Sequence, residues 1–113
     1  MEETVHEYYD TIDEEDFEGL TDLLDPDFVH CRPGGTLEGR EEFVEFMRDE
    51  RPMEETTHKV DGFYGTGPKI ANGTEAVARG RVVSDSDDET LFDFVDIFVF
   101  EDSAIKEIRT YTP

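Results

Sequence analysis

The segment from Phe92 to Phe100 constrains the fold more than any other part of this sequence. Its residues, FDFVDIFVF, are aromatic or aliphatic except for two aspartates, and most are β-branched or aromatic, which is typical of a β-strand. Side chains alternate along a strand, so one face carries Phe92, Phe94, Asp96, Phe98 and Phe100, and the other carries Asp93, Val95, Ile97 and Val99. Because both faces are mainly apolar, we expect both to be covered.

Asp96 lies in the middle of the aromatic face. A carboxylate in that position loses hydration, so its pKa is expected to rise unless a cation or hydrogen-bond donors compensate. Carboxyl groups placed in this way are frequent at sites that transfer protons. Two interpretations stay open from the strand alone. Asp96 takes part in catalysis or ligand contact, or it is a buried carboxylate paired with an arginine for structural reasons.

Helical periodicity dominates the first part of the chain. Apolar residues recur at helical spacing over residues 5–12, behind Thr4 as a candidate N-cap, and again over residues 17–24. The acidic residues 13–16 between them suit a bend or a new helix start. Asp25-Pro26-Asp27 is expected to end the second helix.

A short strand is predicted over residues 28–32, followed by a turn at Pro33-Gly34-Gly35 and a third helix from Arg40 to Arg51. The rest of the sequence predicts strands over residues 56–64, 75–83, 91–100 and 104–111. Asn72-Gly73 is a strong hairpin signal. Helices first and an antiparallel series of strands afterwards predict an α+β fold, in one domain spanning residues 1–113.

The chain is very acidic, with 31 aspartates and glutamates against 10 lysines and arginines and a formal net charge of -21. The acids are spread along the sequence and apolar periodicity persists between them, so we expect a folded chain. This composition is typical of proteins from halophilic archaea, in whose cytoplasm salt screens the self-repulsion. The alternative is an acidic surface that mimics DNA or binds a basic partner. Nucleic-acid binding is disfavoured by the sign of the charge.

Cys31 is the single cysteine, so no intramolecular disulfide is expected. The first residues lack the basic and apolar regions of a signal peptide, and no segment has the length of apolar residues that a membrane span requires. We therefore expect a cytoplasmic location and no membrane partner.

The order of these elements and several short segments resemble the nuclear transport factor 2-like superfamily, which includes ketosteroid isomerases and SnoaL-type polyketide cyclases. The segments that carry the resemblance are YYDTID at 8–13, DFEGL at 16–20, DFVH at 27–30, LEGREEF at 37–43, FVDIFVF at 94–100 and IRTY at 108–111. The resemblance implies a cone-shaped, cystatin-like barrel in which N-terminal helices pack on a curved antiparallel sheet. It is specific for fold and not for function, because this scaffold hosts isomerases, cyclases, dehydratases, hydrolases and non-catalytic binders.

The resemblance also suggests roles for individual residues. Tyr8 takes the position of the isomerases' oxyanion-stabilising tyrosine, and Asp96 that of a protonated aspartic acid that donates a second hydrogen bond. Counted from Tyr8 without a gap, the position of the general-base aspartate falls on Arg32. An arginine does not take up a proton at neutral pH, so a true steroid isomerase is not expected.

Arg32 suggests other chemistry. Phe28, His30 and Arg32 share one strand face, which the resemblance directs into the cone together with Asp96. An Arg32–Asp96 pair would keep the aspartate ionised. With His30 as a candidate acid or base, this arrangement resembles the cyclase branch, in which an aspartate abstracts a proton beside a carbonyl. The epoxide-opening hydrolase branch uses an arginine between two carboxylates. Of these three groups the sequence supplies two, Arg32 and Asp96, so this branch is matched less well. A buried Arg–Asp pair in an inert pocket is the structural alternative.

The remaining site predictions concern the walls of the cone. The candidate ligand-binding residues are Phe28, Phe46, Met47, Phe94 and Phe98. No histidine or cysteine has the spacing of a metal site, and Thr90 stands where a calcium loop beginning at Asp85 would need glycine, so no metal and no cofactor is expected. His58 is a weaker candidate than His30. Arg79 and Arg81 share a strand face and either reach the pocket or pair with surface acids.

Two functions are consistent with the sequence. The first is a cofactor-free acid–base enzyme of isomerase, cyclase or dehydratase type that acts on an apolar carbonyl or polyketide-like compound. The second is a non-catalytic protein that binds a small apolar molecule or only forms a dimer. A homodimer is expected in either case, because the face with Val95, Ile97 and Val99 is apolar where a solvated sheet face would be polar.

Overall fold

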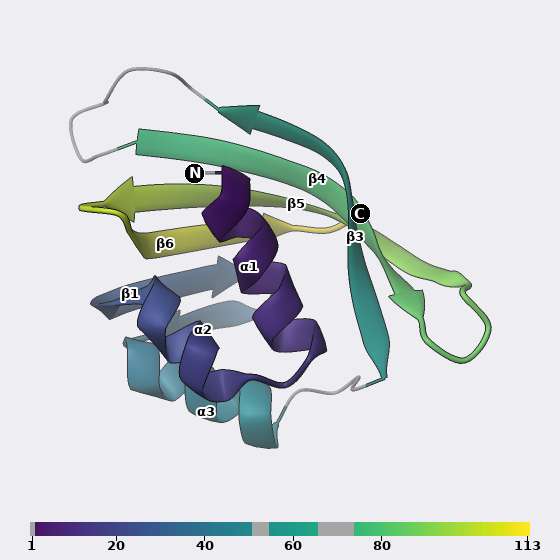
Figure 1. Ribbon diagram of the computed structural model, residues 1–113, viewed down its shortest axis with the longest axis horizontal. Coiled ribbons are helices and arrows are strands. Elements are labelled where there is room, and N and C mark those ends of the chain that lie inside the picture. The colour runs from purple at the N-terminus through teal and green to yellow at the C-terminus, as the bar shows by residue number, and fades with distance from the viewer. Residues whose placement is uncertain (1, 51–54, 66–73) are drawn as a thin grey trace.

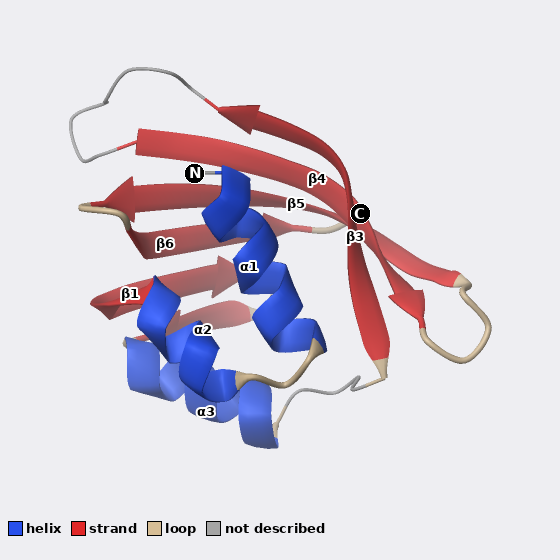
Figure 2. Ribbon diagram, in the orientation of Figure 1, coloured by secondary structure: helices blue, strands red, loops and turns tan. Residues whose placement is uncertain are grey.

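The computed structural model describes residues 2–50, 55–65 and 74–113, and these residues form three helices and six strands. In chain order the elements are α1 (Glu2–Asp13), α2 (Phe17–Leu23), β1 (Leu24–Arg32), β2 (Gly35–Glu38), α3 (Arg40–Asp49), β3 (Thr56–Gly65), β4 (Thr74–Ser84), β5 (Thr90–Glu101) and β6 (Ala104–Tyr111). The strands form one sheet in the order β2-β1-β6-β5-β4-β3, and the helices cover its concave face (Figures 1 and 2). The predicted α+β architecture, with helices on a curved sheet, is confirmed.

One strand pair departs from the expected antiparallel arrangement. β1 and β6 run parallel, whereas all other neighbouring strands of the described sheet are antiparallel. No tight turn joins β1 to β6, so a hairpin does not fix the direction of β1. The sheet is therefore mixed, and His30 lies beside Ile108, near the C-terminal end of β6.

Irregular register curves the sheet around the helices. The pairing shifts between Val60 and Gly62 on β3, between Val82 and Val83 on β4, and between Val99 and Phe100 on β5. Such irregularities bend and twist a strand locally. As a result β3 crosses the end of the molecule where α1 ends (Figure 1), and the Asp13 carboxylate accepts a hydrogen bond from the His58 backbone N–H at 3.0 Å.

Short-range chemistry accounts for two of the chain reversals. Asp16 caps α2 by accepting a hydrogen bond from the Gly19 backbone N–H at 3.0 Å, as expected for an acid at a new helix start. Asp102 and Ser103, with φ of 51° and 73°, connect β5 to β6. Two consecutive residues with positive φ give the hairpin turn that matches strand twist.

Several predicted boundaries are wrong. Thr4 lies inside α1 rather than at its N-cap, since the helix already includes Glu2. β1 begins at Leu24, and its pairing with β6 is irregular around Pro26, which has no N–H to donate. β2 was not predicted. α3 ends at Asp49, whereas the predicted helix end at Arg51 and the Asn72-Gly73 hairpin lie outside the described residues.

The core lies between the helices and the inner face of the sheet. The alternation of β5 is as predicted, because Phe94, Asp96, Phe98 and Phe100 are buried, and Val95, Ile97 and Val99 on the outer face are only partly exposed. The residues of α1 with helical spacing, including Tyr8, Tyr9 and Ile12, pack against this inner face.

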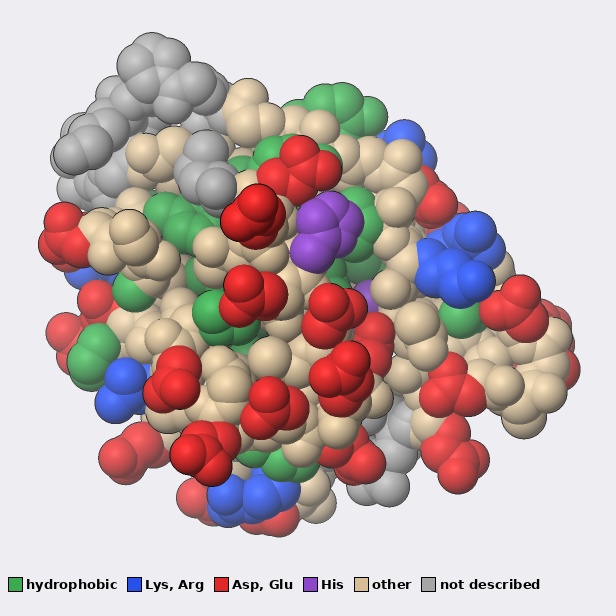
Figure 3. Space-filling model, in the orientation of Figure 1, with side chains coloured by type: hydrophobic (Ala, Val, Ile, Leu, Met, Phe, Trp, Pro, Cys, Tyr) green, Lys and Arg blue, Asp and Glu red, His purple; other side chains and the backbone are tan. Residues whose placement is uncertain are grey.

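Acidic side chains are dispersed over the helical face rather than gathered in one stripe (Figure 3). In the described part of the chain, none of the helices has the length and apolar run required to cross a membrane.

Candidate functional site

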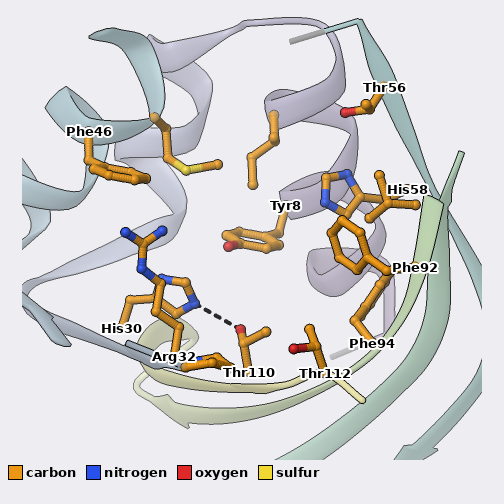
Figure 4. Close-up of a pocket in the computed structure, with 14 residues that line it drawn as sticks. Tyr8, His30, Arg32, Phe46, Thr56, His58, Phe92, Phe94, Thr110 and Thr112 are labelled. Carbon is orange, nitrogen blue, oxygen red and sulfur yellow. Dashed lines mark hydrogen bonds between the residues drawn. The ribbon is translucent and has the colours of Figure 1, made fainter. Parts of the chain in front are cut away.

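A cavity of about 310 Å³ lies between the helices and the concave face of the sheet. Residues from both helices and strands line it (Figure 4): Tyr8, Ile12, His30, Arg32, Pro33, Phe46, Met47, Thr56, His58, Val82, Phe92, Phe94, Thr110 and Thr112. Half of these residues are apolar, and apolar atoms form most of the cavity surface. The polar groups are two histidines, an arginine, a tyrosine and three threonines.

The predicted site residues divide between the cavity wall and the core behind it. Tyr8, His30 and Arg32, predicted to act in catalysis, line the cavity, as do Phe46, Met47 and Phe94, predicted to bind the ligand. Asp96, Phe28 and Phe98 do not line it, and all three are buried in the core. Phe28 and Phe98 face the same interior but are covered by other side chains, among them Phe43 against Phe28 and Tyr8 against Phe98.

Asp96 is 5 % exposed and accepts two hydrogen bonds from hydroxyl groups. Tyr9 Oη donates to Oδ2 at 2.6 Å, and Thr110 Oγ1 donates to Oδ1 at 2.5 Å. Thr110 is the cross-strand neighbour of Asp96 on β6. Burial raises the pKa of Asp96, whereas the hydrogen bonds from Thr110 and Tyr9 and the charge of His58 oppose that rise.

The predicted pairing of Arg32 with Asp96 is wrong. The Arg32 guanidinium lies over the ring of Phe46, with Cζ 4.0 Å from the ring centroid, and makes no ion pair with a described carboxylate. Arg32 is the last residue of β1, where Pro33 turns the chain, and both residues line the cavity. Asp96 lies deeper, and the two hydroxyl groups satisfy it without a cation.

Thr110 connects Asp96 to His30. His30 Nε2 lies 2.8 Å from Thr110 Oγ1 (dashed line in Figure 4). The single hydroxyl hydrogen of Thr110 is directed to Asp96, so His30 Nε2 carries the hydrogen and donates to Thr110. In a neutral ring Nδ1 is then an acceptor, and this buried atom has no hydrogen-bond partner among the described residues.

His30 is held in its neutral form. It is 8 % exposed, and burial, followed by the nearby positive charge of Arg32, lowers its pKa from 6.5 to about 4. The position of His30 on the inward strand face is therefore as predicted, but its environment makes it a weak base with one unused acceptor nitrogen.

The two adjacent tyrosines of α1 have different surroundings. Tyr9 is bonded to Asp96, while the Tyr8 ring lies across the cavity, with its hydroxyl directed toward the side where His30 and Arg32 lie (Figure 4). Burial, and then the negative charge of Asp96, raises the pKa of both hydroxyl groups. Both tyrosines are therefore neutral donors, and the Tyr8 hydroxyl makes no hydrogen bond to another described residue.

A second histidine of the wall carries a carboxylate partner that sequence reasoning missed. His58 Nδ1 lies 2.6 Å from Asp13 Oδ1, and both side chains are largely buried. An ionised carboxylate only accepts, so Nδ1 carries the hydrogen, and in the neutral ring Nε2 has the lone pair. The His58 ring also stacks on Tyr9, with centroids 5.2 Å apart. The alternation of Thr56, His58 and Val60 on one strand face was the only sequence signal, and it gave no hint of Asp13.

The two arginines whose role was left open both lie away from the cavity. Arg81 pairs with Asp61, with Nε 3.4 Å from Oδ2, and Arg79 is hydrogen-bonded to Tyr64 on the outer face of the sheet. Among the described residues, no group of three histidine, cysteine or acidic side chains is arranged to hold a metal ion.

Comparison with known proteins places the chain in a family. No sequence match to a curated protein was found. A protein from Kribbella flavida proposed to be a ketosteroid isomerase is 20% identical, with a TM-score of 0.77 over 97% of this chain and 75% of that one. A proposed SnoaL-like polyketide cyclase from Jannaschia is 17% identical, with a TM-score of 0.74 over 97% and 83% of the two chains.

A cystatin-like protein of unknown function from Nostoc punctiforme is 14% identical, with a TM-score of 0.80 over 98% of this chain and 86% of that one. At these identities the structural likeness establishes the fold alone. The sequence itself matches the SnoaL-like domain over residues 5–108, and this chain therefore belongs to the SnoaL-like domain family.

Proposed function

We propose that this protein is a cofactor-free acid–base catalyst that removes and returns a proton beside the carbonyl group of a small, mainly apolar compound. The observation that carries the proposal is the His58–Asp13 pair at the wall of an apolar cavity. A histidine that is oriented by a buried carboxylate is a common arrangement for proton transfer, because the carboxylate fixes the tautomer and stabilises the imidazolium.

His58 is the proposed base of the two histidines in the cavity. The Asp13 carboxylate is hydrogen-bonded to its Nδ1, whereas His30 lies near the positive charge of Arg32 and has a pKa lowered to about 4. In the proposed step, a carbon beside the substrate carbonyl gives its proton to His58 Nε2. The electron pair of that C–H bond moves to form an enolate, and His58 then returns the proton to the same or a neighbouring carbon.

Tyr8 supplies the donor for the enolate oxygen. Its hydroxyl is neutral and makes no hydrogen bond to another described residue, and it is directed to the side of the cavity opposite His58 (Figure 4). A donor that is already desolvated stabilises developing negative charge more than water does. In this proposal Asp96 is a positioning residue that orients His30 through Thr110.

The test is solvent exchange of the hydrogens beside a carbonyl group, followed by NMR in D₂O. The probes are β-tetralone and benzoylpropionate, which are a neutral and an anionic aryl ketone. The wild-type protein is expected to accelerate exchange of at least one probe, and His58→Gln is expected to lose about a hundredfold or more of that rate. His6→Gln is the matched control, because His6 is exposed on α1 and pairs with Glu2. The proposal fails if His58→Gln retains the wild-type rate or if neither ketone exchanges faster than in buffer.

A non-catalytic ligand-binding protein is the second candidate. It is favoured by the position of Asp96, which is off the cavity wall and satisfied by Tyr9 and Thr110. Binding of either ketone, measured by thermal shift, without any acceleration of exchange would support this candidate.

A further inference from the structure

The described cavity wall lacks acidic side chains, which is unusual for a chain of this composition. Acidic residues make up more than a quarter of the sequence, yet none of the 14 described residues that line the cavity is an aspartate or glutamate. Burial by itself depletes charges of both signs. The wall nevertheless keeps one permanent cation, Arg32.

Arg32 is held in place by an aromatic ring and not by a carboxylate. Its guanidinium lies over the face of Phe46, with Cζ 4.0 Å from the ring centroid. Stacking occupies the flat face of the guanidinium, and the N–H groups around its edge stay available as donors. Among the described residues no side chain makes an ion pair or hydrogen bond with these groups. In contrast, Arg48, Arg81 and Arg109 each pair with a carboxylate.

We propose that the ligand of this cavity is an organic carboxylate, whose head group binds the N–H edge of Arg32 and whose apolar body packs against the apolar wall. This inference rests on the cavity of the proposed function and specifies the class of its ligand. The side chains that would contact the apolar body are Ile12, Met47, Val82, Phe92 and Phe94.

The surroundings of Arg32 favour a monoanion. The neutral Tyr8 hydroxyl, which is the proposed donor for the enolate oxygen, is directed to the same side of the cavity and adds no charge there (Figure 4). The single guanidinium of Arg32 therefore matches a single negative charge. A phosphate dianion would leave a charge uncompensated in a chain whose net charge is already -21.

The size of the cavity limits the apolar body. At about 310 Å³ it lies at the lower end of the range of small-molecule sites. One or two fused rings or a short alkyl chain would fill it. Naphthylacetate is therefore a suitable probe, and naphthylethanol is its neutral counterpart of similar shape.

The test compares the affinities of these two probes by isothermal titration calorimetry, at the lowest salt concentration at which the protein is folded. Wild-type protein is expected to bind naphthylacetate about tenfold or more tightly than naphthylethanol, as one charge-assisted hydrogen-bonded pair implies. Arg32→Gln should abolish this preference while retaining affinity for the alcohol. Arg32→Lys should restore only part of it, because lysine lacks the planar N–H edge.

Arg79→Gln is the matched control, since Arg79 lies on the outer face of the sheet and should not change either affinity. The proposal is overturned if wild-type protein binds the alcohol as tightly as the carboxylate, if neither probe binds up to its solubility limit, or if the preference survives in Arg32→Gln. Tighter binding of naphthylmethyl phosphate than of naphthylacetate would overturn the assignment of a carboxylate. These results do not depend on turnover, so the exchange experiment with His58→Gln can fail or succeed separately.

Discussion

The Tyr9 hydroxyl donates a hydrogen bond of 2.6 Å to the Asp96 carboxylate and so joins the first helix to the centre of the fifth strand. Tyr8, one residue earlier, lines the cavity instead. Successive residues on an α-helix point about 100° apart, so adjacent tyrosines meet different parts of the interior. One of them positions the buried carboxylate, and the other is available to a ligand.

Tyr9→Phe should destabilise the fold more than Tyr8→Phe. Loss of the Tyr9 hydroxyl leaves Asp96 Oδ2 buried without its donor, at a cost of about 1–3 kcal/mol. Tyr8→Phe removes a hydroxyl that has no hydrogen-bond partner among the described residues. Urea unfolding of both variants measures the difference, and equal losses would contradict the assignment of the hydrogen bond to Tyr9.

Asp96→Asn should change the pH dependence of the unfolding free energy, in addition to the hydrogen bonds that Asp96 makes in the site. The pKa of Asp96 is raised in the folded protein, chiefly by burial, so the group stabilises the fold most when it is protonated. That contribution is lost as the pH rises from the ordinary carboxyl value of about 4 through the raised pKa. The difference in unfolding free energy between wild type and Asp96→Asn should therefore shift in favour of the variant as the pH rises. A difference that is independent of pH would contradict the raised pKa.

His30 should make the protein less stable as the medium becomes acidic. Its pKa is lowered from 6.5 to about 4 in the fold, so the unfolded chain binds its proton first as the pH falls. Stability is then lost between about pH 6.5 and pH 4, by about 3 kcal/mol in total if the full shift is expressed. His30→Gln removes this titration, and the wild type should lose stability relative to the variant across that interval. Parallel pH profiles would count against a neutral, buried His30.

The melting temperature should rise strongly with salt. A net charge of -21 on 113 residues opposes compaction at low ionic strength, and ions screen that repulsion. Calorimetry in dilute buffer and in molar potassium chloride should differ by many degrees. If the melting temperature is the same in both, the proposed adaptation to a salt-rich cytoplasm is wrong.

The protein is proposed to form a homodimer through the outer face of its sheet. Val95, Ile97 and Val99 lie side by side on β5 and are only partly exposed, with Val77 of β4 opposite Ile97. Ile97→Glu should place a charge in the contact and give a monomer by sedimentation at molar salt. Thr90→Glu, which adds the same charge at the exposed start of β5, should stay dimeric. A monomeric wild-type protein would contradict the proposal.

The sequence alone determined the features that arise within a few neighbouring residues. The alternation of β5 placed Asp96 on the buried face, and helical spacing placed both Tyr8 and Tyr9 toward the core. The acidic start of α2 and the turn at Asp102 and Ser103 also follow from local chemistry. Backbone geometry fixes the direction of each side chain along one helix or strand. The spacing of apolar residues in the sequence therefore shows directly which side chains share a face.

Only the tertiary structure decided which of these residues meet. The parallel pairing of β1 with β6 brings His30 to Thr110, and the curvature of β3 brings His58 to Asp13. The tertiary structure also places Arg32 over Phe46 rather than beside Asp96. These contacts join segments far apart in the chain, and they depend on strand order and on irregular register. Local periodicity carries no information about either, because it records which way a side chain points along its own element and not which element lies opposite.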